Sequence, residues 1–326
     1  MKHTWISRLA YTTGMLLALC AGTAMAQGSS FPNRPVKMIV GYPPGGGNDQ
    51  IARAVSQRLS EIWKQPVIVE NRAGASGSIG ADAVARAVPD GYTLLLTGSS
   101  HLIQAAVSPK VVPYKAVDDF TPVSMVGSAQ LVVEVHPSVP ANNIRELIAL
   151  AKTRRLAYGS AGTGTSPHIA GEMFARAAGI EMTHVPYKGS APAQTDLIGG
   201  QVQLVFQVTQ SALTSVKAGQ VRAIAVTGKG RLPDLPNVPT VAESGLPGYS
   251  LEIWWGVLAP PGLPAEVLRA LNEGVRQAAA HPDVQKRLNM AGLQVESTSS
   301  EEMQKTMRTD LDAFIKLVRE AGIKED

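Results

Sequence analysis

Short apolar runs along the chain alternate with longer stretches in which apolar residues recur every three or four positions. This alternation is typical of β-α-β units, in which a helix follows each strand. Several of the runs are apolar at nearly every position, which predicts strands that helices cover on both faces. We therefore predict an α/β fold. The predicted strands are residues 36–40, 66–69, 92–96, 156–158, 202–206 and 221–226.

Two helices can be placed closely from the sequence. The first lies between the first two strands and has the spacing of an amphipathic helix docked on a sheet. Its apolar positions are Ile51, Val55, Leu59 and Ile62. In the last helix, Ser299 and Glu302 have the spacing of a capping box, and Gly322 follows the helix. Its predicted apolar stripe is Met303, Met307, Leu311, Phe314, Ile315 and Val318.

The length and composition are those of a soluble globular protein of two domains. The chain has 326 residues, and a domain usually has about 100–200. Hydrophobic residues make up 44% and charged residues 17%, which excludes a disordered chain and a protein with many membrane spans. No repeat or low-complexity linker marks a boundary, so the proline-rich stretch 232–247 is the best candidate for a crossing between domains.

The first 26 residues have the pattern of a secretory signal peptide. Lys2 and Arg8 precede an apolar stretch at 15–19, which runs into Ala24-Met25-Ala26. We predict export and cleavage after Ala26. An uncleaved anchor helix is the alternative, but the apolar part is much shorter than the roughly 20 residues that cross a membrane.

The only cysteine, Cys20, lies in this segment. It could be the lipid-bearing residue of a lipoprotein, although bulky Leu19 stands where a small residue is expected. The mature chain then has no thiol, which excludes disulfides, thiolate metal sites and a cysteine nucleophile. Removal of Lys2 and Arg8 leaves 28 basic residues against 26 acidic ones, and this small net charge does not indicate nucleic acid or a membrane surface.

A first glycine-rich loop, residues 41–49, leads from the first strand into the first helix. Asn48 or Asp49 can cap that helix, and the glycines let the backbone approach a ligand closely. A helix N-terminus has unpaired N–H groups and about half a positive charge. Such a loop can therefore hold a carboxylate without Lys or Arg.

A second glycine-rich loop, residues 159–168, follows another strand and opens another helix. Ser166 is the predicted N-cap and Pro167 the first helical residue. His168 falls in the first turn, where it can donate to a ligand oxygen or have a structural role alone. Further hydrogen bonds to a ligand can come from the hydroxyls of Ser160, Thr163, Thr165 and Ser166.

Each loop alone can be an ordinary strand-to-helix turn, but two of them in separate segments favour a shared site. Neither has the Gly-Lys-Ser/Thr ending of a phosphate loop or the full Gly-x-Gly-x-x-Gly order, which argues against a nucleotide. The sequence has no Gly-x-Ser-x-Gly elbow and no two histidines three to five residues apart. We predict no catalytic residue, no metal and no cofactor.

Seven short stretches have a familiar order: FPNRP (31–35), PGGGND (44–49), VENRAGA (69–75), PDGYTLL (89–95), YGSAGTGTSPH (158–168), VPYKG (185–189) and PTVAESG (239–245). With them the sequence resembles the periplasmic binding proteins of tripartite tricarboxylate transporters, the Bug receptor family. Together they span nearly all of the chain after the signal. The resemblance implies a type II periplasmic-binding-protein fold, in which two Rossmann-like lobes enclose a ligand cleft.

The resemblance also implies an organisation and a function. Lobe 1 is expected at 27–127 and 247–326, and lobe 2 at 128–246. The expected protein is a periplasmic, monomeric receptor that binds a di- or tricarboxylate or an aromatic carboxylate and delivers it to membrane permease subunits. Two other functions stay open: a sensory receptor that uses the same cleft, and an exported enzyme that acts on the same acids.

In the family, one ligand carboxylate is held by the second glycine-rich loop and the other faces the first. Ser99 to His101 match a third cleft loop. Gln207 stands where many relatives have an acidic residue, which favours a plain carboxylic acid over an amino acid. Tyr42 and Trp255 can form an aromatic wall or pack in the core. The predicted ligand-binding residues are Tyr42, Pro44, Gly45, Gly46, Ser99, Ser100, His101, Ser160, Gly162, Thr163, Gly164, Thr165, Ser166, His168 and Gln207.

Overall fold

The structure, a computed structural model, describes residues 31–290 and 292–323. Of these, residues 34–290 and 292–323 belong to one compact unit, and residues 31–33 lie outside that unit. The predicted signal peptide and its cleavage site after Ala26 lie outside the described residues. Within the described part, no helix has both the length and the apolar character that crossing a membrane requires.

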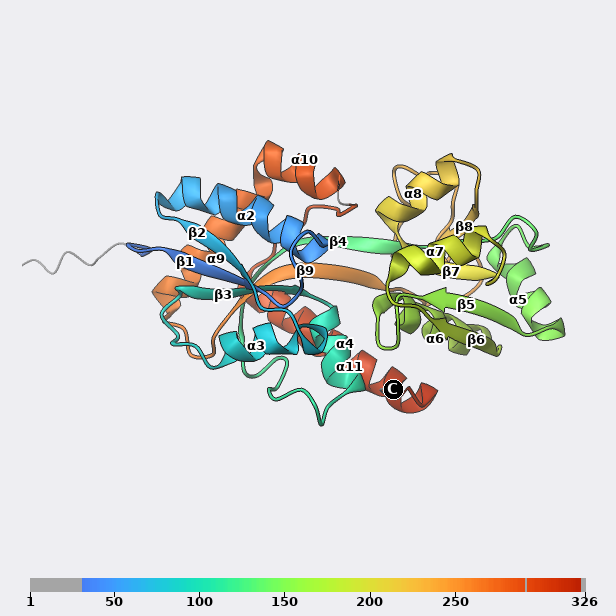
Figure 1. Ribbon diagram of the computed structural model, residues 1–326, viewed down its shortest axis with the longest axis horizontal. Coiled ribbons are helices and arrows are strands. Elements are labelled where there is room, and N and C mark those ends of the chain that lie inside the picture. Colours follow the sequence, from blue (N-terminus) through green and yellow to red (C-terminus); the bar gives the residue numbers. More distant parts are fainter. Residues whose placement is uncertain (1–30, 291, 324–326) are drawn as a thin grey trace, which may run out of the picture. The chain divides into compact units, whose positions relative to one another are not determined.

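The described residues contain a nine-stranded sheet with the order β2-β1-β3-β9-β4-β7-β5-β6, in which β8 also pairs with β4 (Figure 1). Strand β1 is parallel to β2 and β3, and β5 is parallel to β6 and β7. Strands β4 and β9 are antiparallel to all their partners. The strands are β1 (Val36–Val40), β2 (Val67–Asn71), β3 (Thr93–Gly98), β4 (Thr121–Val135), β5 (Leu156–Ser160), β6 (Met182–Pro186), β7 (Leu204–Val208), β8 (Arg222–Val226) and β9 (Glu252–Ala259).

Two strands that the sequence did not predict, β4 and β9, join the two groups of parallel strands. Residues 121–130 of β4 pair with β9, and residues 131–135 pair with β7 and β8. The proline-rich stretch 232–247, predicted as the crossing, does not link the two groups. Instead Leu232 packs beside Val226 of β8, because this stretch folds back on the strand that precedes it.

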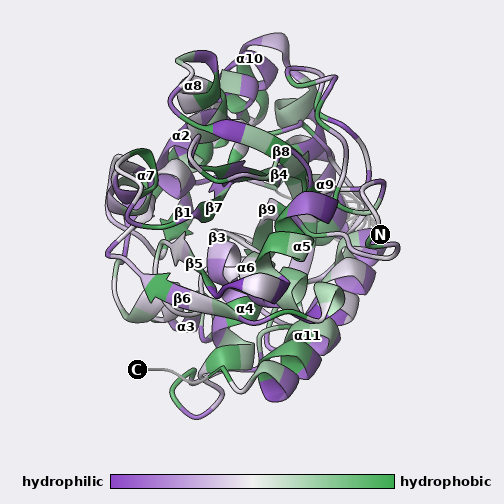
Figure 2. Cartoon of the chain, turned by 90° about the vertical axis from the view of Figure 1, so that its right-hand side faces the viewer, coloured by the Kyte–Doolittle hydropathy of each residue, from purple (hydrophilic) through white to green (hydrophobic). Residues whose placement is uncertain are grey.

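Helices connect the strands and cover the sheet. They are α2 (Gly47–Trp63), the short 3-10 helix η1 (Ala75–Gly77), α3 (Ser78–Ala85), α4 (Ser100–Val107), α5 (Ile144–Thr153), α6 (Ser166–Ala178), α7 (Ser190–Ile198), α8 (Thr209–Lys217), α9 (Ala265–Ala280), α10 (Pro282–Met290) and α11 (Ser300–Ala321). The alternation of hydrophilic and hydrophobic residues that lets one face of α11 pack inward can be followed in Figure 2.

Helix α11 begins with the predicted capping box. The Ser299 hydroxyl accepts the Glu302 N–H at 3.1 Å, and the Glu302 carboxylate accepts the Ser299 N–H at 2.8 Å. The predicted apolar stripe is wrong at Ile315, which is 38% exposed. Leu317 is buried instead, because Ile315 lies about 100° around the helix from Phe314 and so turns away from the core.

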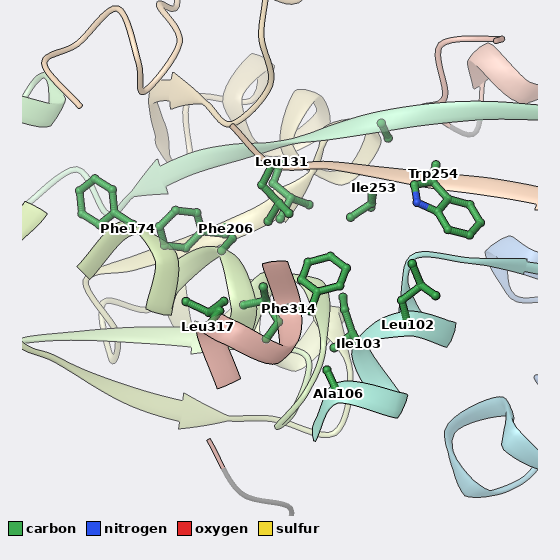
Figure 3. Close-up of a cluster of buried hydrophobic side chains, with 14 of the residues drawn as sticks. Leu102, Ile103, Ala106, Leu131, Phe174, Phe206, Ile253, Trp254, Phe314 and Leu317 are labelled. Atoms are coloured by element: carbon green, nitrogen blue, oxygen red, sulfur yellow. The ribbon is translucent and has the colours of Figure 1, made fainter. Parts of the chain in front are cut away.

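A large cluster of buried apolar side chains runs beneath the join made by β4 and β9 (Figure 3). In it, Phe174 of α6 lies against Phe206 of β7, with ring centroids 5.8 Å apart. Phe314 and Leu317 of α11 belong to the same cluster as Ile103 of α4. Helix α11 thus packs on both α4 and α6, the helices whose N-termini follow two of the predicted loops.

Candidate functional site

A cavity of about 420 Å³ lies where the loops after β1, β3 and β5 meet. Two other hollows, of about 390 and 500 Å³, lie along α11 and contain none of the predicted ligand-binding residues. The 420 Å³ cavity is therefore the candidate site. Its lining residues are Tyr42, Asn48, Ser76, Gly98, Ser99, Ser100, Gln104, Ala161, Thr163, Gly164, Thr165, Ser166, Pro167, Ser190, Val208, Ile253, Trp254 and Trp255.

The N-termini of five helices contribute to this lining. They belong to α2, α4, α6, α7 and α8, which contribute Asn48, Ser100, Ser166, Ser190 and the N-cap Val208. Among the described lining residues there is no Lys, Arg, His, Asp or Glu. Each helix N-terminus presents unpaired N–H groups and about half a positive charge. The cavity therefore favours an anion without providing a cationic side chain.

The first glycine-rich loop is held by the buried carboxylate of Asp49. Its Oδ2 accepts hydrogen bonds from the Gly45 N–H at 2.9 Å and from Arg53 Nε at 2.8 Å. Its Oδ1 accepts one from Asn71 Nδ2 at 3.0 Å. The Arg53 hydrogen bond is the main reason that the pKa of Asp49 is below its usual value. Asp49 thus stays ionised and fixes the loop from inside α2.

Neither of the predicted caps of α2 caps the helix. The N-cap is Gly46, where no side chain makes a capping hydrogen bond. Asn48 Oδ1 instead accepts a hydrogen bond from Trp255 Nε1 at 2.7 Å, which ties the first turn of α2 to β9. The Asp49 carboxylate instead accepts hydrogen bonds from Gly45, Arg53 and Asn71. A tertiary contact has therefore used the side chain of Asn48, whereas Asp49 bonds both within its own loop and helix and to Asn71 of β2.

The loop after β3 approaches β9 closely at Gly98. A Cβ added to Gly98 would lie 2.4 Å from the Trp254 carbonyl oxygen. Ser99 donates its N–H to the same carbonyl at 3.0 Å, and its hydroxyl accepts the Trp254 N–H at 3.0 Å. This double contact brings Ser99 and Ser100 onto the cavity wall beside the tryptophans of β9.

Tyr42 connects the first and third loops. Its hydroxyl lies 3.0 Å from the Ser76 carbonyl oxygen and 3.0 Å from Ser100 Oγ. Burial raises the pKa of the phenol above its usual value, and the Ser100 contact opposes this only in part. Tyr42 is therefore a neutral hydrogen-bonding group, and its ring forms an aromatic side of the cavity with Trp255.

The second glycine-rich loop leads into α6 one residue earlier than predicted. The N-cap is Thr165 and not Ser166. The Thr165 hydroxyl donates to the Gly162 carbonyl at 2.7 Å, so the loop closes on itself. The Ile169 N–H donates to the Thr165 carbonyl at 3.0 Å. The Ser166 N–H precedes this bond and therefore has no carbonyl partner within the helix.

Of the fifteen predicted ligand-binding residues, the structure brings seven into the cavity wall. These are Tyr42, Ser99, Ser100, Thr163, Gly164, Thr165 and Ser166. For the other eight, which the cavity lining does not include, contact with a ligand stays a prediction. They are Pro44, Gly45, Gly46, His101, Ser160, Gly162, His168 and Gln207.

His101 is buried behind α4. Its Nε2 lies 2.8 Å from the Ala116 carbonyl oxygen, and its ring stacks on Tyr114 with centroids 5.2 Å apart. The edge of Phe120 closes the other side, at 4.9 Å. Burial lowers the pKa of His101 to about 4, so the imidazole is neutral. These surroundings are those of a structural histidine.

Gln207 lies within β7 and is buried. Its Nε2 donates to Gln194 Oε1 of α7 at 2.7 Å. Close by on β4, Glu134 is fully buried, and none of its carboxylate oxygens has a hydrogen-bond partner among the described residues. Gln194 Nε2 also lacks one there. Burial raises the pKa of Glu134 to about 7.

Several lining residues were not predicted as ligand-binding. Trp254 and Ile253 had no local signal, because they lie on β9, whose place in the sheet depends on long-range pairing. Ser190 did have one: it follows Gly189 at the start of a helix that comes after a strand. This is the same strand-loop-helix order as in the two glycine-rich loops.

Sequence comparison relates the chain to a known family over nearly its whole length. A profile of the tripartite tricarboxylate transporter family receptor matches residues 51–323. The chain is 34% identical over 323 residues to the protein BugT of Bordetella pertussis, which covers 98% of this chain and 99% of BugT.

Solved structures show the same fold. A protein of R. palustris solved with adipate is 33% identical, with a TM-score of 0.77 over 90% of this chain and 99% of that one. MatC from Rhodopseudomonas palustris, solved with bound malate, is 29% identical, with a TM-score of 0.74 over 88% of this chain and 100% of that one. The predicted fold class, the α/β fold of periplasmic solute-binding proteins, is confirmed.

Proposed function

We propose that this chain, which belongs to the tripartite tricarboxylate transporter family of receptors, binds a small organic acid in the 420 Å³ cavity and passes it unchanged to a membrane permease. Its family consists of periplasmic solute-binding receptors, as the motifs in the sequence predicted. We propose three things for this chain: that the ligand is an organic acid, that it is released unchanged, and that a membrane permease receives it.

One observation carries the proposal: five helix N-termini meet at a cavity whose described lining has no charged side chain. Backbone N–H groups and hydroxyls can solvate a carboxylate there at no cost of burying a Lys or Arg. The volume is within the roughly 300–1,000 Å³ that is usual for small-molecule sites. The relatives solved with adipate and malate, both dicarboxylates, support the same ligand class.

The lining residues also restrict which acids fit the cavity. Tyr42 and Trp255 provide aromatic surface, with Ile253 and Val208 beside them. Such a wall suits an acid whose carboxylates are joined by an apolar chain or a ring. A ligand ammonium group would find no carboxylate in the described lining, and Gln207 is neutral. We therefore propose a di- or tricarboxylate or an aromatic carboxylate and not an amino acid.

The proposed contacts come from both glycine-rich loops. The seven predicted residues of the cavity wall contact the ligand directly. Pro44, Gly45 and Gly46 are exposed and approach it when lobe 1 (27–127 and 247–326) and lobe 2 (128–246) close. The long ladder between β4 and β9 supports these lobes, because it is the connection about which they can move.

The proposed route begins with export. The signal peptide is removed after Ala26, and residues 27–326 act in the periplasm as a monomer. The absence of cysteine from this mature segment supports a binding role over one class of enzyme, the thiol-dependent hydrolases. No nucleic acid, metal or cofactor takes part in the proposal.

The test uses residues 27–326 and a thermal-shift screen with adipate, malate, citrate, phthalate, nicotinate and glutamate. A ligand at 100 times its Kd adds about 2.7 kcal/mol to the free energy of unfolding, which is several degrees for a protein of this size. Calorimetry then gives the Kd, and NMR of the recovered ligand reports whether it has reacted.

We expect at least one of the first five acids to raise the melting temperature and to be recovered unchanged, and glutamate to have no effect. A ligand that is consumed would overturn the receptor assignment. A screen in which no carboxylate raises the melting temperature would overturn the ligand class.

A further inference from the structure

Two stacked histidines lie behind the second glycine-rich loop. The rings of His168 on α6 and His184 on β6 are nearly parallel, at 8°, with centroids 3.9 Å apart. The buried ring of Tyr158 continues the stack, 5.0 Å from His184. Gly171 makes room for it, since a Cβ there would lie 2.3 Å from the Tyr158 ring. Neither histidine belongs to the cavity lining.

Both histidines are joined to backbone amides of the loop. His168 Nδ1 accepts the Gly164 N–H at 3.0 Å. His184 Nε2 lies 2.6 Å from Ser160 Oγ, and the same oxygen accepts the Gly162 N–H at 3.1 Å. The loop is therefore held at two alternate amides, directly by one imidazole and through a buried serine by the other.

Gly162 and Gly164 are also the two residues of this loop that have positive φ angles. Gly162 has φ +127° and Gly164 has φ +75°, values that glycine adopts at little cost but does not favour over its many other conformations. The loop therefore needs contacts that select this conformation. The residues it presents to the cavity, Thr163 to Ser166, follow directly from it.

We propose that His168 and His184 are positioning residues of the ligand cavity, which hold the second glycine-rich loop in its binding conformation through the Gly164 and Gly162 amides. This inference rests on the proposed function, because the conformation of the loop affects binding only if the cavity binds a ligand. It assigns to His168 the role of a hydrogen-bond acceptor for the backbone, gives Ser160 the role of a link to the Gly162 amide, and adds His184 to the site.

The positions of the acceptor atoms show which substitutions can separate hydrogen bonding to the loop from packing of the rings. His168 Nδ1 must be unprotonated to accept the Gly164 N–H, so its ring is neutral. An Asn side chain places an oxygen near the position of Nδ1, whereas Phe keeps a flat ring and has no acceptor. For His184 the contact is at Nε2, which Gln can reproduce and Phe cannot.

The experiment compares His168→Phe with His168→Asn, His184→Phe with His184→Gln, and Ser160→Ala with the wild type, all as residues 27–326. Hydrogen exchange of the peptide 159–168 is measured by mass spectrometry without ligand. The Kd for adipate and for malate is measured by calorimetry on the same proteins.

We expect exchange in this peptide to be at least tenfold faster in both Phe variants and in Ser160→Ala, and within threefold of the wild type in His168→Asn and His184→Gln. The variants with faster exchange should also bind the acid more weakly, and His168→Asn and His184→Gln should bind it nearly as tightly as the wild type. Equal exchange in all variants would overturn the proposal, and so would a loss that Asn and Gln do not restore, because packing alone would then explain it.

The two proposals fail separately. If neither acid binds the wild type but exchange follows the expected order, the positioning role stands, and the wider screen of acids decides the ligand class separately. Should the Phe variants fail to fold, Ser160→Ala decides the outcome for the His184 contacts, since it removes one small hydroxyl and no ring. His168→Leu, which is apolar and has no acceptor, then replaces His168→Phe for the Gly164 contact.

Discussion

Ser166 is the position at which an anion site in the cavity can be tested by a change of charge. It is the first residue of α6 and lines the cavity. We expect Ser166→Asp to weaken adipate binding tenfold or more, because two like charges about 6 Å apart repel by roughly 3 kcal/mol at an effective dielectric constant of 20. Calorimetry measures the loss. Ser166→Asn, similar in size and neutral, is the matched control and should bind within a few fold of the wild type.

The same substitution separates binding from folding. An acidic residue in the first turn of a helix usually stabilises it by about 0.3–1 kcal/mol. The melting temperature of Ser166→Asp without ligand should therefore be equal to or above that of the wild type. Unimpaired adipate binding by this variant would contradict an anion site at the N-terminus of α6.

Glu134 makes the stability of the protein depend on pH in a predictable direction. Burial raises its pKa from 4.5 to about 7, so the folded state binds a proton more tightly than the unfolded state. Its contribution to stability is complete below pH 4.5 and is lost as pH rises through 7. We compare the free energy of unfolding of Glu134→Gln with that of the wild type. From about pH 4.5 to 8, the value for the variant minus that for the wild type should increase by on the order of 2–3 kcal/mol.

The measurement is urea unfolding of both proteins across this pH range. Glu273→Gln, which changes an exposed carboxylate on α9, is the control and should keep a constant difference from the wild type. A constant difference for Glu134→Gln as well would mean that folding does not raise the pKa of Glu134.

Among the elements, the contact between β3 and β9 depends on the absence of a side chain at Gly98. A Cβ there would lie 2.4 Å from a backbone oxygen of β9, and backbone cannot move aside as a side chain can. We expect Gly98→Ala to destabilise the protein by about 1–3 kcal/mol or more, as overpacking does. Thermal unfolding checks this. Gly47→Ala, where a Cβ would meet nothing within 4 Å, should leave stability unchanged or slightly higher.

The elements that could be predicted from the sequence are those whose signals are local. Strand β1 was predicted with its observed bounds, and the Ser299–Glu302 capping box forms as expected. Strand β4 was missed because Gly127, Ser128 and Gln130 interrupt its apolar run, and it is a strand by virtue of its pairing with β9. That pairing joins segments more than a hundred residues apart and leaves no mark within either one.

The candidate site divides in the same way. The glycine-rich loops and the hydroxyls of Thr163 to Ser166 could be predicted, because a strand-to-helix turn with glycines has a local pattern. His101 could not be told from a ligand contact, since its neighbours Tyr114 and Phe120 come from the next loop. Asn48 was expected to cap α2, but a partner on β9 uses its side chain.

For the molecule as a whole, the distribution of charge predicts a weak effect of salt on binding. The chain has a formal net charge of only +4, and no charged residue is among the described lining of the cavity. We expect the Kd for adipate to change less than about threefold between roughly 50 and 500 mM NaCl, because salt screens exposed charges far more than helix ends in a cavity. Calorimetry at both concentrations tests this.

A variant provides the contrast. Ser166→Lys puts a cation in the cavity wall, and its affinity for adipate should exceed that of the wild type at low salt and fall more with salt than that of the wild type. A wild-type affinity that falls tenfold or more with salt would mean that charges outside the cavity govern binding.

Tyr42 is the one ionisable side chain in the described lining of the cavity, and its raised pKa keeps it neutral. A ligand that enters near neutral pH therefore exchanges no proton with the cavity wall. The heat of binding should be the same in buffers of different ionisation enthalpy, and the pH profile of affinity should be the titration curve of the ligand itself. For the acid that we propose as ligand, one ionisation state is then the one that binds, and the acidity of the compartment sets how much of the acid is in that state.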